Sequence, residues 1–218
     1  MAALPELVVN VKVDAPPNWW RYDGGDPSIK LFDRAIAAWP MDLPQGARVL
    51  ELGCAETDFH ARLLALRPDI RLTGVDVNDV PGYTGTFIRG AAEQQHFSGA
   101  SFEAVICLGS LEHFGLGFYG DPECLDADMS VVRRAAQWLV PGGWLYYDVP
   151  WTPQSGHITD NRHFRVYDDA QIRTRLTGSL RPVSRMYAHG QTDEPVAIRP
   201  DSPTTPFWYL QRLLVKDA

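Results

Sequence analysis

The sequence is poor in cysteine and lacks the cysteine spacing of a thiolate metal site. It has three cysteines, Cys54, Cys107 and Cys124, and no two of them form a CxxC pair. An odd count, with two of the three in predicted core strands or turns, predicts a reduced, cytoplasmic protein. It also argues against a metal site built from thiolates.

Positive charge and long apolar runs are also scarce. The chain has 20 Lys and Arg against 27 Asp and Glu, a formal net charge of −7, so we expect no broad cationic surface for nucleic acid. No run approaches the ~20 apolar residues that a membrane-spanning helix needs. The first six residues also lack the basic and apolar regions of a secretory signal. We therefore expect neither a nucleic-acid nor a membrane partner.

An apolar content of 45% over 218 residues supports one well-packed core. Short apolar runs typical of buried strands alternate with helical patterns, which predicts an α/β fold. We expect strands over residues 7–13, 48–52, 71–76, 86–90, 102–108, 144–149, 182–187 and 207–216, and helices over 29–39, 58–66, 126–139 and 168–176.

The most informative stretch runs from Arg48 to Asp58. It contains a buried strand, a turn at Gly53 and the start of a helix. Such a unit places backbone N–H groups and a helix N-terminus against a nucleotide-like ligand. The next strand ends at Asp76, roughly 20 residues beyond Gly53, which is the usual offset for a carboxylate that accepts the hydroxyls of a ribose.

Taken together, these motifs resemble the class I S-adenosylmethionine-dependent methyltransferases. Glu51-x-Gly53 is followed by Gly74-Val75-Asp76, and the likeness continues through residues 102–106, 111–113 and 139–143. The resemblance implies a doubly wound, mostly parallel, seven-stranded Rossmann-like sheet with the last strand antiparallel. It also implies one domain over residues 1–218, with an N-terminal lid and helix (1–45), a cofactor-binding core (46–151) and substrate-side loops and last strands (152–218).

The implied cofactor is S-adenosylmethionine, bound at the carboxyl ends of the strands. The candidate cofactor-binding residues are Glu51, Gly53, Cys54, Ala55, Asp76, Val77, Ala92, Glu93, Leu108, Gly109 and Ser110. The family's turn usually has three glycines, and here Ala55 and Thr57 occupy the second and third positions. Ala55 adds only a methyl group, and Thr57 is able to cap the following helix.

A second departure concerns the adenine. The family often has an Asp-Ala pair after the third strand, whereas this chain has Ala91-Ala92 followed by Glu93. Adenine would then be held by backbone groups, by Glu93 or by Gln94. The alternative for Glu93 is a solvated acid near a helix start.

Two polar loops, residues 109–122 and 150–167, follow central strands and carry the candidate catalytic residues His113, His157 and His163. Methyl transfer needs in-line alignment, and an O–H or N–H acceptor must lose a proton, which a histidine is suited to take. The alternative is that these histidines only hydrogen-bond the loops. A divalent ion held by His and Asp is a further option, although His157 and His163 do not have an established ligand spacing, and we assign no metal site.

We therefore expect a methyltransferase that acts on a small-molecule acceptor, on oxygen before nitrogen, as a monomer or homodimer. For Arg162 and Arg165 the default expectation is surface ion pairing, and the alternative is that they clamp a carboxylate or phosphate of the acceptor. The competing functions are a non-catalytic S-adenosylmethionine-binding module, a metal-assisted O-methyltransferase and a nicotinamide oxidoreductase. Against the last, Asp58 stands where the dinucleotide fingerprint has its final glycine.

Overall fold

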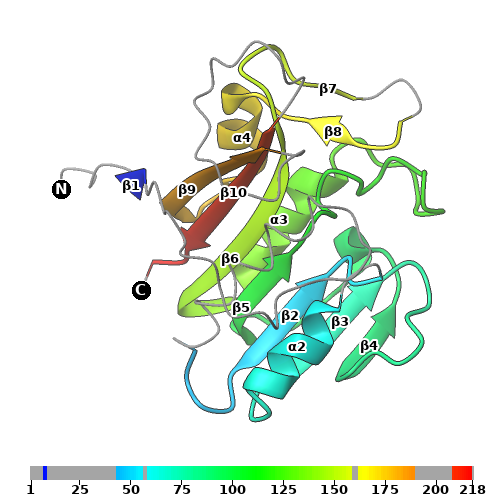
Figure 1. Ribbon diagram of the computed structural model, residues 1–218, viewed down its shortest axis with the longest axis vertical. Coiled ribbons are helices and arrows are strands. Elements are labelled where there is room, and N and C mark those ends of the chain that lie inside the picture. Colours follow the sequence, from blue (N-terminus) through cyan, green and yellow to red (C-terminus); the bar gives the residue numbers. More distant parts are fainter. Residues whose placement is uncertain (1–6, 9–42, 56–57, 159–161, 190–207, 218) are drawn as a thin grey trace.

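The computed structural model describes residues 7–8, 43–55, 58–158, 162–189 and 208–217 (Figure 1). The predicted helix over 29–39 and the predicted lid therefore lie outside the described residues. The elements are β1 (Leu7–Val8), β2 (Arg48–Leu52), α2 (Phe59–Leu66), β3 (Arg71–Asp76), β4 (Thr86–Arg89), the 3-10 helix η3 (Ala92–Gln94), β5 (Phe102–Cys107), α3 (Ala127–Trp138), β6 (Leu139–Trp151), β7 (His157–Ile158), β8 (Arg165–Val166), α4 (Asp169–Arg175), β9 (Arg181–His189) and β10 (Trp208–Val215).

The central sheet has the strand order β1-β9-β10-β6-β5-β2-β3-β4. Strands β4, β3, β2, β5 and β6 run parallel, and β10 is antiparallel to both of its neighbours, β6 and β9. This confirms the predicted doubly wound sheet with an antiparallel last strand. The two-residue β1 adds an eighth strand, parallel to β9 at the edge. The chain places β3 and β4 on one side of β2 and then places β5 and β6 on the other side. In open α/β sheets a crevice forms where the strand order reverses in this way, so we expect one between the carboxyl ends of β2 and β5.

Both faces of the sheet are covered, and α2 lies over β2 and β3 (Figure 1). Val105 of β5 packs in the apolar cluster that contains the buried residues of α3 and α4, whereas its neighbour Ile106 packs in the cluster that contains Phe59 of α2. A strand buried on both faces needs apolar side chains at successive positions. This explains why β5 reads as a continuous apolar run.

Strand β6 begins earlier than the sequence predicts. The pattern predicted a helix to 139 and a strand over 144–149, but α3 ends at Trp138 and β6 runs from Leu139 to Trp151. Proline disfavours a helical conformation for the residue before it, so Pro141 prevents Val140 from continuing the helix. The glycines that follow extend the sheet, because Gly142 N donates to Lys216 O and Lys216 N donates to Gly143 O, each at 2.9 Å.

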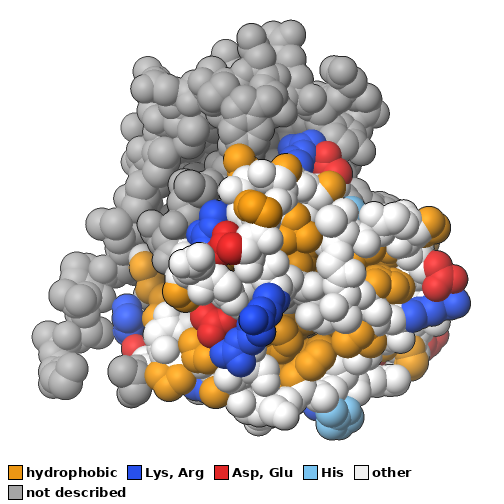
Figure 2. Space-filling model, turned by 90° about the horizontal axis from the view of Figure 1, so that it is seen from below, with side chains coloured by type: hydrophobic (Ala, Val, Ile, Leu, Met, Phe, Trp, Pro, Cys, Tyr) orange, Lys and Arg blue, Asp and Glu red, His pale blue; other side chains and the backbone are white. Residues whose placement is uncertain are grey.

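The predicted polar loop over 150–167 also contains regular structure, since β7 and β8 form a two-stranded antiparallel hairpin. The described chain contains no helix of the length and apolarity that crossing a membrane requires. At the amino ends of the parallel strands, ion pairs join Arg48 to Glu103 at 2.7 Å and Arg67 to Asp69 at 2.8 Å. Figure 2, seen from below, shows basic and acidic side chains interspersed among apolar ones on its described face.

A buried polar network fixes α4 and β8 against α3. Asp128 of α3 is fully buried and accepts hydrogen bonds from the Tyr167 hydroxyl at 2.9 Å and from Arg175 at 3.0 and 2.7 Å. The Arg165 guanidinium lies 3.8 Å from the same carboxylate. Burial, and next the charge of Asp128, holds the pKa of Tyr167 well above its ordinary value. A buried ionic network of this kind is costly to break at one member.

Asp128→Asn should therefore lower the free energy of unfolding by about 3–5 kcal/mol, because two arginines lose their buried countercharge. Asp126→Asn is the matched control, since Asp126 pairs with the same Arg175 at 3.1 Å but its side chain is 60% exposed. That change should cost about 0–1 kcal/mol. Urea unfolding measures both, and equal losses for the two variants would contradict the role given to Asp128.

Candidate functional site

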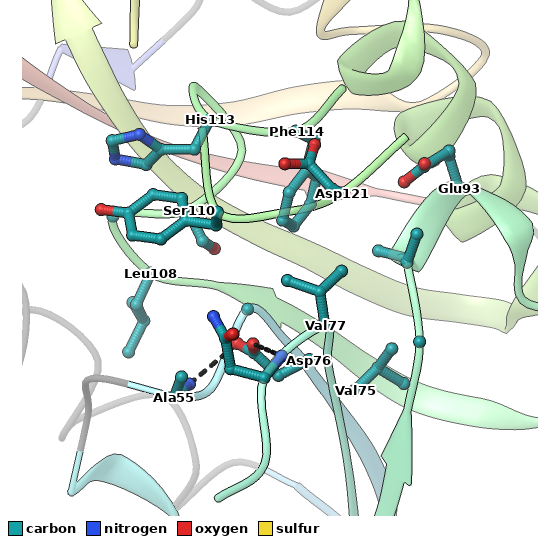
Figure 3. Close-up of a pocket in the computed structure, with 17 residues that line it drawn as sticks. Ala55, Val75, Asp76, Val77, Glu93, Leu108, Ser110, His113, Phe114 and Asp121 are labelled. Carbon is teal, nitrogen blue, oxygen red and sulfur yellow. Dashed lines mark hydrogen bonds between the residues drawn. The ribbon is translucent and has the colours of Figure 1, made fainter. Parts of the chain in front are cut away.

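A cavity lies at the carboxyl ends of β2, β3 and β5 (Figure 3). Four segments line it: the turn after β2 with Gly53 and Ala55, the end of β3 with residues 75–78, the segment 90–93 after β4, and the loop 108–121 after β5. These segments meet where the sheet changes its building direction, which is where open α/β sheets bind their ligands.

Asp76 and the glycine turn are joined directly. The Asp76 carboxylate accepts hydrogen bonds from Ala55 N at 2.9 Å and from Asn78 N at 2.8 Å, and its side chain lines the cavity. Gly53 has a φ of +71°, and a Cβ there would collide with Ser110. Gly53 and Asp76 therefore line the same cavity, and their role in binding the cofactor stays a prediction.

The segment after β5 is tied to both neighbouring strands. The Ser110 hydroxyl donates to Leu52 O at 2.9 Å, and Gly109 N donates to the Asp148 carboxylate at 2.7 Å. Both side-chain oxygens are thus used to hold the backbone of this segment beside β2 and β6. Gly109 and Ser110, together with Leu108, line the cavity.

Two of the predicted cofactor-binding residues lie outside the lining. Glu51 is 1% exposed, and its carboxylate accepts a hydrogen bond from the Tyr83 hydroxyl at 2.8 Å. The Tyr83 ring crosses β3 at Gly74, where any Cβ would collide with it. Cys54 is fully buried beside the turn, and burial raises the pKa of its thiol above the ordinary range. Glu51 and Cys54 therefore support the cavity wall from behind.

The imidazole of His113 lines the cavity in a defined tautomer. Its Nδ1 lies 2.6 Å from the carbonyl oxygen of His163. A carbonyl only accepts, so Nδ1 carries the proton and Nε2 presents a lone pair. Burial lowers the pKa of His113 to about 4, so the ring is neutral at neutral pH.

Glu112, the neighbour of His113, is a second buried titratable group. It is 2% exposed, and its Oε1 lies 3.9 Å from Nε2 of His113. Burial and then the charge of Asp148 raise its pKa well above the ordinary value. Burial therefore disfavours the charged form of the carboxyl beside the imidazole, in the same direction in which burial disfavours the charged form of His113.

The other two predicted histidines occupy different places. His163 fixes His113 through its carbonyl; its ring stacks on Phe118, with 4.1 Å between centroids, and its Nε2 lies 3.1 Å from the Tyr119 hydroxyl. His157 belongs to the β7–β8 hairpin. Only His113 of the three is in the cavity lining. Among the described residues, no group of three or more His, Cys, Asp or Glu side chains is arranged to hold a metal ion.

Neither candidate arginine is placed to clamp an acceptor. Arg165 is 4% exposed, and its guanidinium donates to the carbonyl oxygens of Glu112, Phe114 and Leu125 at 3.2, 2.7 and 3.1 Å. It therefore holds the loop after β5 in place. Arg162 forms an exposed ion pair with Glu123 at 3.0 Å, which is the default expectation from the sequence.

The lining residues that sequence reasoning did not assign to the cofactor or catalytic site include three in the loop after β5, namely Phe114, Tyr119 and Asp121. They lie in a loop whose glycines at 115, 117 and 120 all have positive φ, between +71° and +85°. Those glycines let the backbone fold back over the cavity. The closely spaced glycines were the available signal, but they do not specify which side chain turns inward.

The neutral state of His113 makes stability depend on pH. The unfolded ring titrates near 6.5 and the folded ring near 4, so the unfolded chain binds more protons as the pH falls through this window, and stability is lost. Between pH 7 and pH 5 the loss from this group should be about 2 kcal/mol.

His113→Asn keeps a donor for the His163 carbonyl but cannot titrate. Between pH 7 and pH 5 the free energy of unfolding of this variant should therefore fall by about 2 kcal/mol less than that of the parent protein. Urea unfolding at both pH values measures this. His96→Asn, at an exposed position, is the control and should follow the parent protein. A His113→Asn variant with the parent's pH dependence would contradict the assignment.

Comparisons with known proteins agree with this geometry. A family model described as a methyltransferase domain matches residues 25–182. A search of curated proteins found no match.

Three solved structures have a similar fold. The 1,6-didemethyltoxoflavin-N1-methyltransferase of Burkholderia thailandensis, with its substrate and S-adenosylhomocysteine bound, has a TM-score of 0.63 and 18% identity over 88% of this chain and 80% of that one. The N-methyltransferase NodS of Bradyrhizobium japonicum, with S-adenosylhomocysteine bound, has a TM-score of 0.62 and 17% sequence identity, and the match covers 94% of each chain. The [4+2]-cyclase SpnF has a TM-score of 0.63 and 14% sequence identity, and the match covers 85% of this chain and 81% of that one.

Such distant structures establish the fold alone, since one fold supports different reactions. The family model spans most of the chain and includes every segment that lines the cavity. The chain therefore belongs to the methyltransferase-domain family and is a class I S-adenosylmethionine-dependent methyltransferase.

Proposed function

We propose that the protein binds S-adenosylmethionine in the cavity between β2, β3 and β5 and transfers the methyl group to a small-molecule acceptor, preferentially to oxygen. The observation that carries the proposal is the Asp76 carboxylate, held beside the glycine turn by Ala55 N and Asn78 N. Each carboxylate oxygen has a further lone pair for a ribose hydroxyl. We also infer a single domain over residues 1–218 and, from the buried thiols of Cys54 and Cys107, a reduced cytoplasmic setting.

The cavity offers different chemistry on the two sides of Asp76. On one side Val77, Ala91 and Ala92 form an apolar wall that suits the faces of an adenine ring. On the other side, the backbone of the glycine turn and of Gly109 approaches the cavity closely and suits the methionyl chain. Glu51 and Cys54 contribute from behind by shaping the turn.

His113 is the residue we assign to the acceptor. Its Nε2 lone pair accepts a hydrogen bond from an acceptor O–H or N–H, and the His163 carbonyl keeps the ring in that tautomer. A pKa of about 4 makes the ring a weak base that stays neutral across the physiological range. Its larger contribution is then alignment of the acceptor lone pair with the methyl group, and proton removal is the smaller one.

A small, flat acceptor fits the rest of the wall. Phe114 and Tyr119 line the cavity beside His113, and aromatic side chains favour stacked or edge-on contact with ring-shaped ligands. The similar structure from Burkholderia thailandensis holds 1,6-didemethyltoxoflavin, the small molecule that the enzyme is named for, which supports a small-molecule acceptor here. The net charge of −7 disfavours a nucleic-acid acceptor.

The cofactor assignment predicts that Asp76→Asn weakens binding of S-adenosylhomocysteine by roughly 10- to 100-fold, because hydrogen bonds to a charged acceptor are lost. Isothermal titration calorimetry measures this, with thermal unfolding as a check that the variant is folded. Asp79→Asn is the matched control, since Asp79 is an exposed acid on the same loop that pairs only with Arg89 among the described residues. Equal affinity for parent and Asp76→Asn would exclude the ribose assignment.

Turnover should be detectable as transfer of labelled methyl from S-adenosylmethionine to phenols, catechols or hydroxylated heteroaromatics, with amines as the second class. His113→Ala should lower the rate for the best acceptor by at least about 10-fold while leaving the affinity for S-adenosylhomocysteine near that of the parent. Transfer only to protein or RNA would contradict the small-molecule proposal. An unchanged rate in His113→Ala would remove the role of His113.

A further inference from the structure

The buried carboxyl of Glu112 has no hydrogen-bonding role in the described part of the chain. Its Oε2 is shielded from solvent and has no partner there, and its Oε1 lies 3.9 Å from Nε2 of His113, beyond hydrogen-bonding distance. The backbone of Glu112 holds the residue in its loop, because its carbonyl oxygen accepts from N of Arg165 at 3.0 Å and from the Arg165 guanidinium at 3.2 Å. A buried acceptor without a donor is unfavourable, so this carboxyl marks a place where an incoming proton would be stabilised.

Methyl transfer to a hydroxyl group releases a proton, and the two titratable groups beside the acceptor differ in basicity. The His113 ring, with a pKa of about 4, is a weak base. The carboxylate of Glu112 is a stronger base than an ordinary carboxylate, because burial and next the charge of Asp148 raise its pKa well above the usual value. Glu112 is therefore the better place for the released proton.

Groups on three neighbouring segments set this basicity. Asp148 of β6 is fully buried and repels the Glu112 carboxylate, whereas the buried Arg165 of β8 attracts it. Cys107 of β5 and Tyr167, which follows β8, also lie within electrostatic reach, and burial raises the pKa of both groups. The thiol and the phenol therefore stay uncharged, and the balance between Asp148 and Arg165 decides how readily Glu112 holds a proton.

His113 separates Glu112 from the cavity. The imidazole lines the cavity, and Glu112 does not (Figure 3). A neutral Nε2 has only a lone pair and no attraction for a carboxylate, which agrees with the 3.9 Å gap. Once Nε2 carries a proton, the ring is a cation and the two groups attract one another. A shift of about 1 Å then brings Nε2 and Oε1 to hydrogen-bonding distance.

Resting on the proposed function, we propose that Glu112 is the final proton acceptor of the methyl transfer and that it acts through His113. The acceptor O–H donates to Nε2 of His113. As a lone pair of that oxygen bonds to the methyl carbon, the electron pair of the S–CH₃ bond stays on sulfur and the O–H proton passes to Nε2. Nε2 then gives the proton to Oε1 of the Glu112 carboxylate, and the ring is neutral again. Nδ1 keeps its own proton on the His163 carbonyl throughout.

The first test is the pH dependence of transfer from labelled S-adenosylmethionine to catechol. Glu112→Gln keeps the side-chain size and the backbone contacts with Arg165, but it cannot take a proton. It should lower kcat near neutral pH by roughly 10- to 100-fold and leave the affinity for S-adenosylhomocysteine within about 2-fold of the parent. The parent's kcat should rise with pH as Glu112 loses its proton, above the ordinary carboxyl range, and the variant should lack this rise.

Asp148→Asn gives a readout that a merely structural role of Glu112 would not produce. The amide oxygen can still accept the hydrogen bond that Gly109 N makes to Asp148 at 2.7 Å, but the negative charge is lost. The pKa of Glu112 should then fall, so the rise in kcat should move to lower pH by about half a unit or more. Glu123→Gln is the control, since Glu123 is 67% exposed and paired with Arg162, and it should follow the parent. An unmoved rise in Asp148→Asn would overturn the proposal.

A second measurement needs no acceptor. Glu112 releases its proton at a lower pH in the unfolded chain than in the folded one, so stability is lost as the pH rises between the two values. Glu112→Gln cannot lose stability in this way. Its free energy of unfolding, relative to that of the parent in urea, should therefore increase between pH 4 and pH 7. A difference that does not depend on pH would contradict the buried, unpaired state of the carboxyl and overturn the proposal.

The outcomes separate this inference from the proposed function. If the parent methylates catechol and Glu112→Gln keeps both the rate and its rise with pH, only the role of Glu112 is overturned. A parent that loses activity in EDTA and regains it with Mg²⁺ would make Glu112 and His113 metal ligands and would also overturn the proton transfer; we expect no effect of EDTA. A parent that methylates neither catechol nor the other phenols and hydroxylated heteroaromatics overturns both proposals.

Discussion

The Asp76 carboxylate, joined to Ala55 N and Asn78 N, is the interaction on which the rest of the site depends. It ties the end of β3 to the turn after β2 and so fixes the spacing of two neighbouring strand ends. Gly53 makes the turn possible, because its φ of +71° and its contact with Ser110 leave no room for a side chain. With these two strand ends in place, the other segments need only close the cavity around a ligand.

The closing segment is held by polar contacts behind the cavity. Arg165 binds three carbonyl oxygens of the loop after β5, and the buried Asp128 holds Arg175 and Tyr167 next to it. Such contacts bring little net stability when complete and are expensive when one member is missing. Their consequence is a fixed loop backbone, which determines the positions of the inward-facing side chains of His113 and Asp121.

Electrostatics inside the cavity follow from burial. Burial keeps the His113 ring neutral at neutral pH and raises the pKa of the neighbouring Glu112, so burial disfavours the charged form of both groups. Glu93 and Asp121, each with one carboxylate oxygen that has no hydrogen-bond partner in the described chain, lie at the other end of the cavity.

Sequence alone determined the order of the helices and of the central-sheet strands in the described chain, the turn at Gly53, the position of Asp76 at the end of β3 and the family, because these depend on local periodicity, turn chemistry and spacing. It misplaced the start of β6, and for Arg165 it offered a surface ion pair or a clamp on the acceptor, whereas Arg165 is buried and holds the loop after β5. It also missed Asp121 and the bond between Tyr83 and Glu51, which joins residues 32 positions apart. Those features were decided by the tertiary structure, because the path of a glycine-rich loop and the burial of an arginine depend on contacts between segments that are distant in the chain.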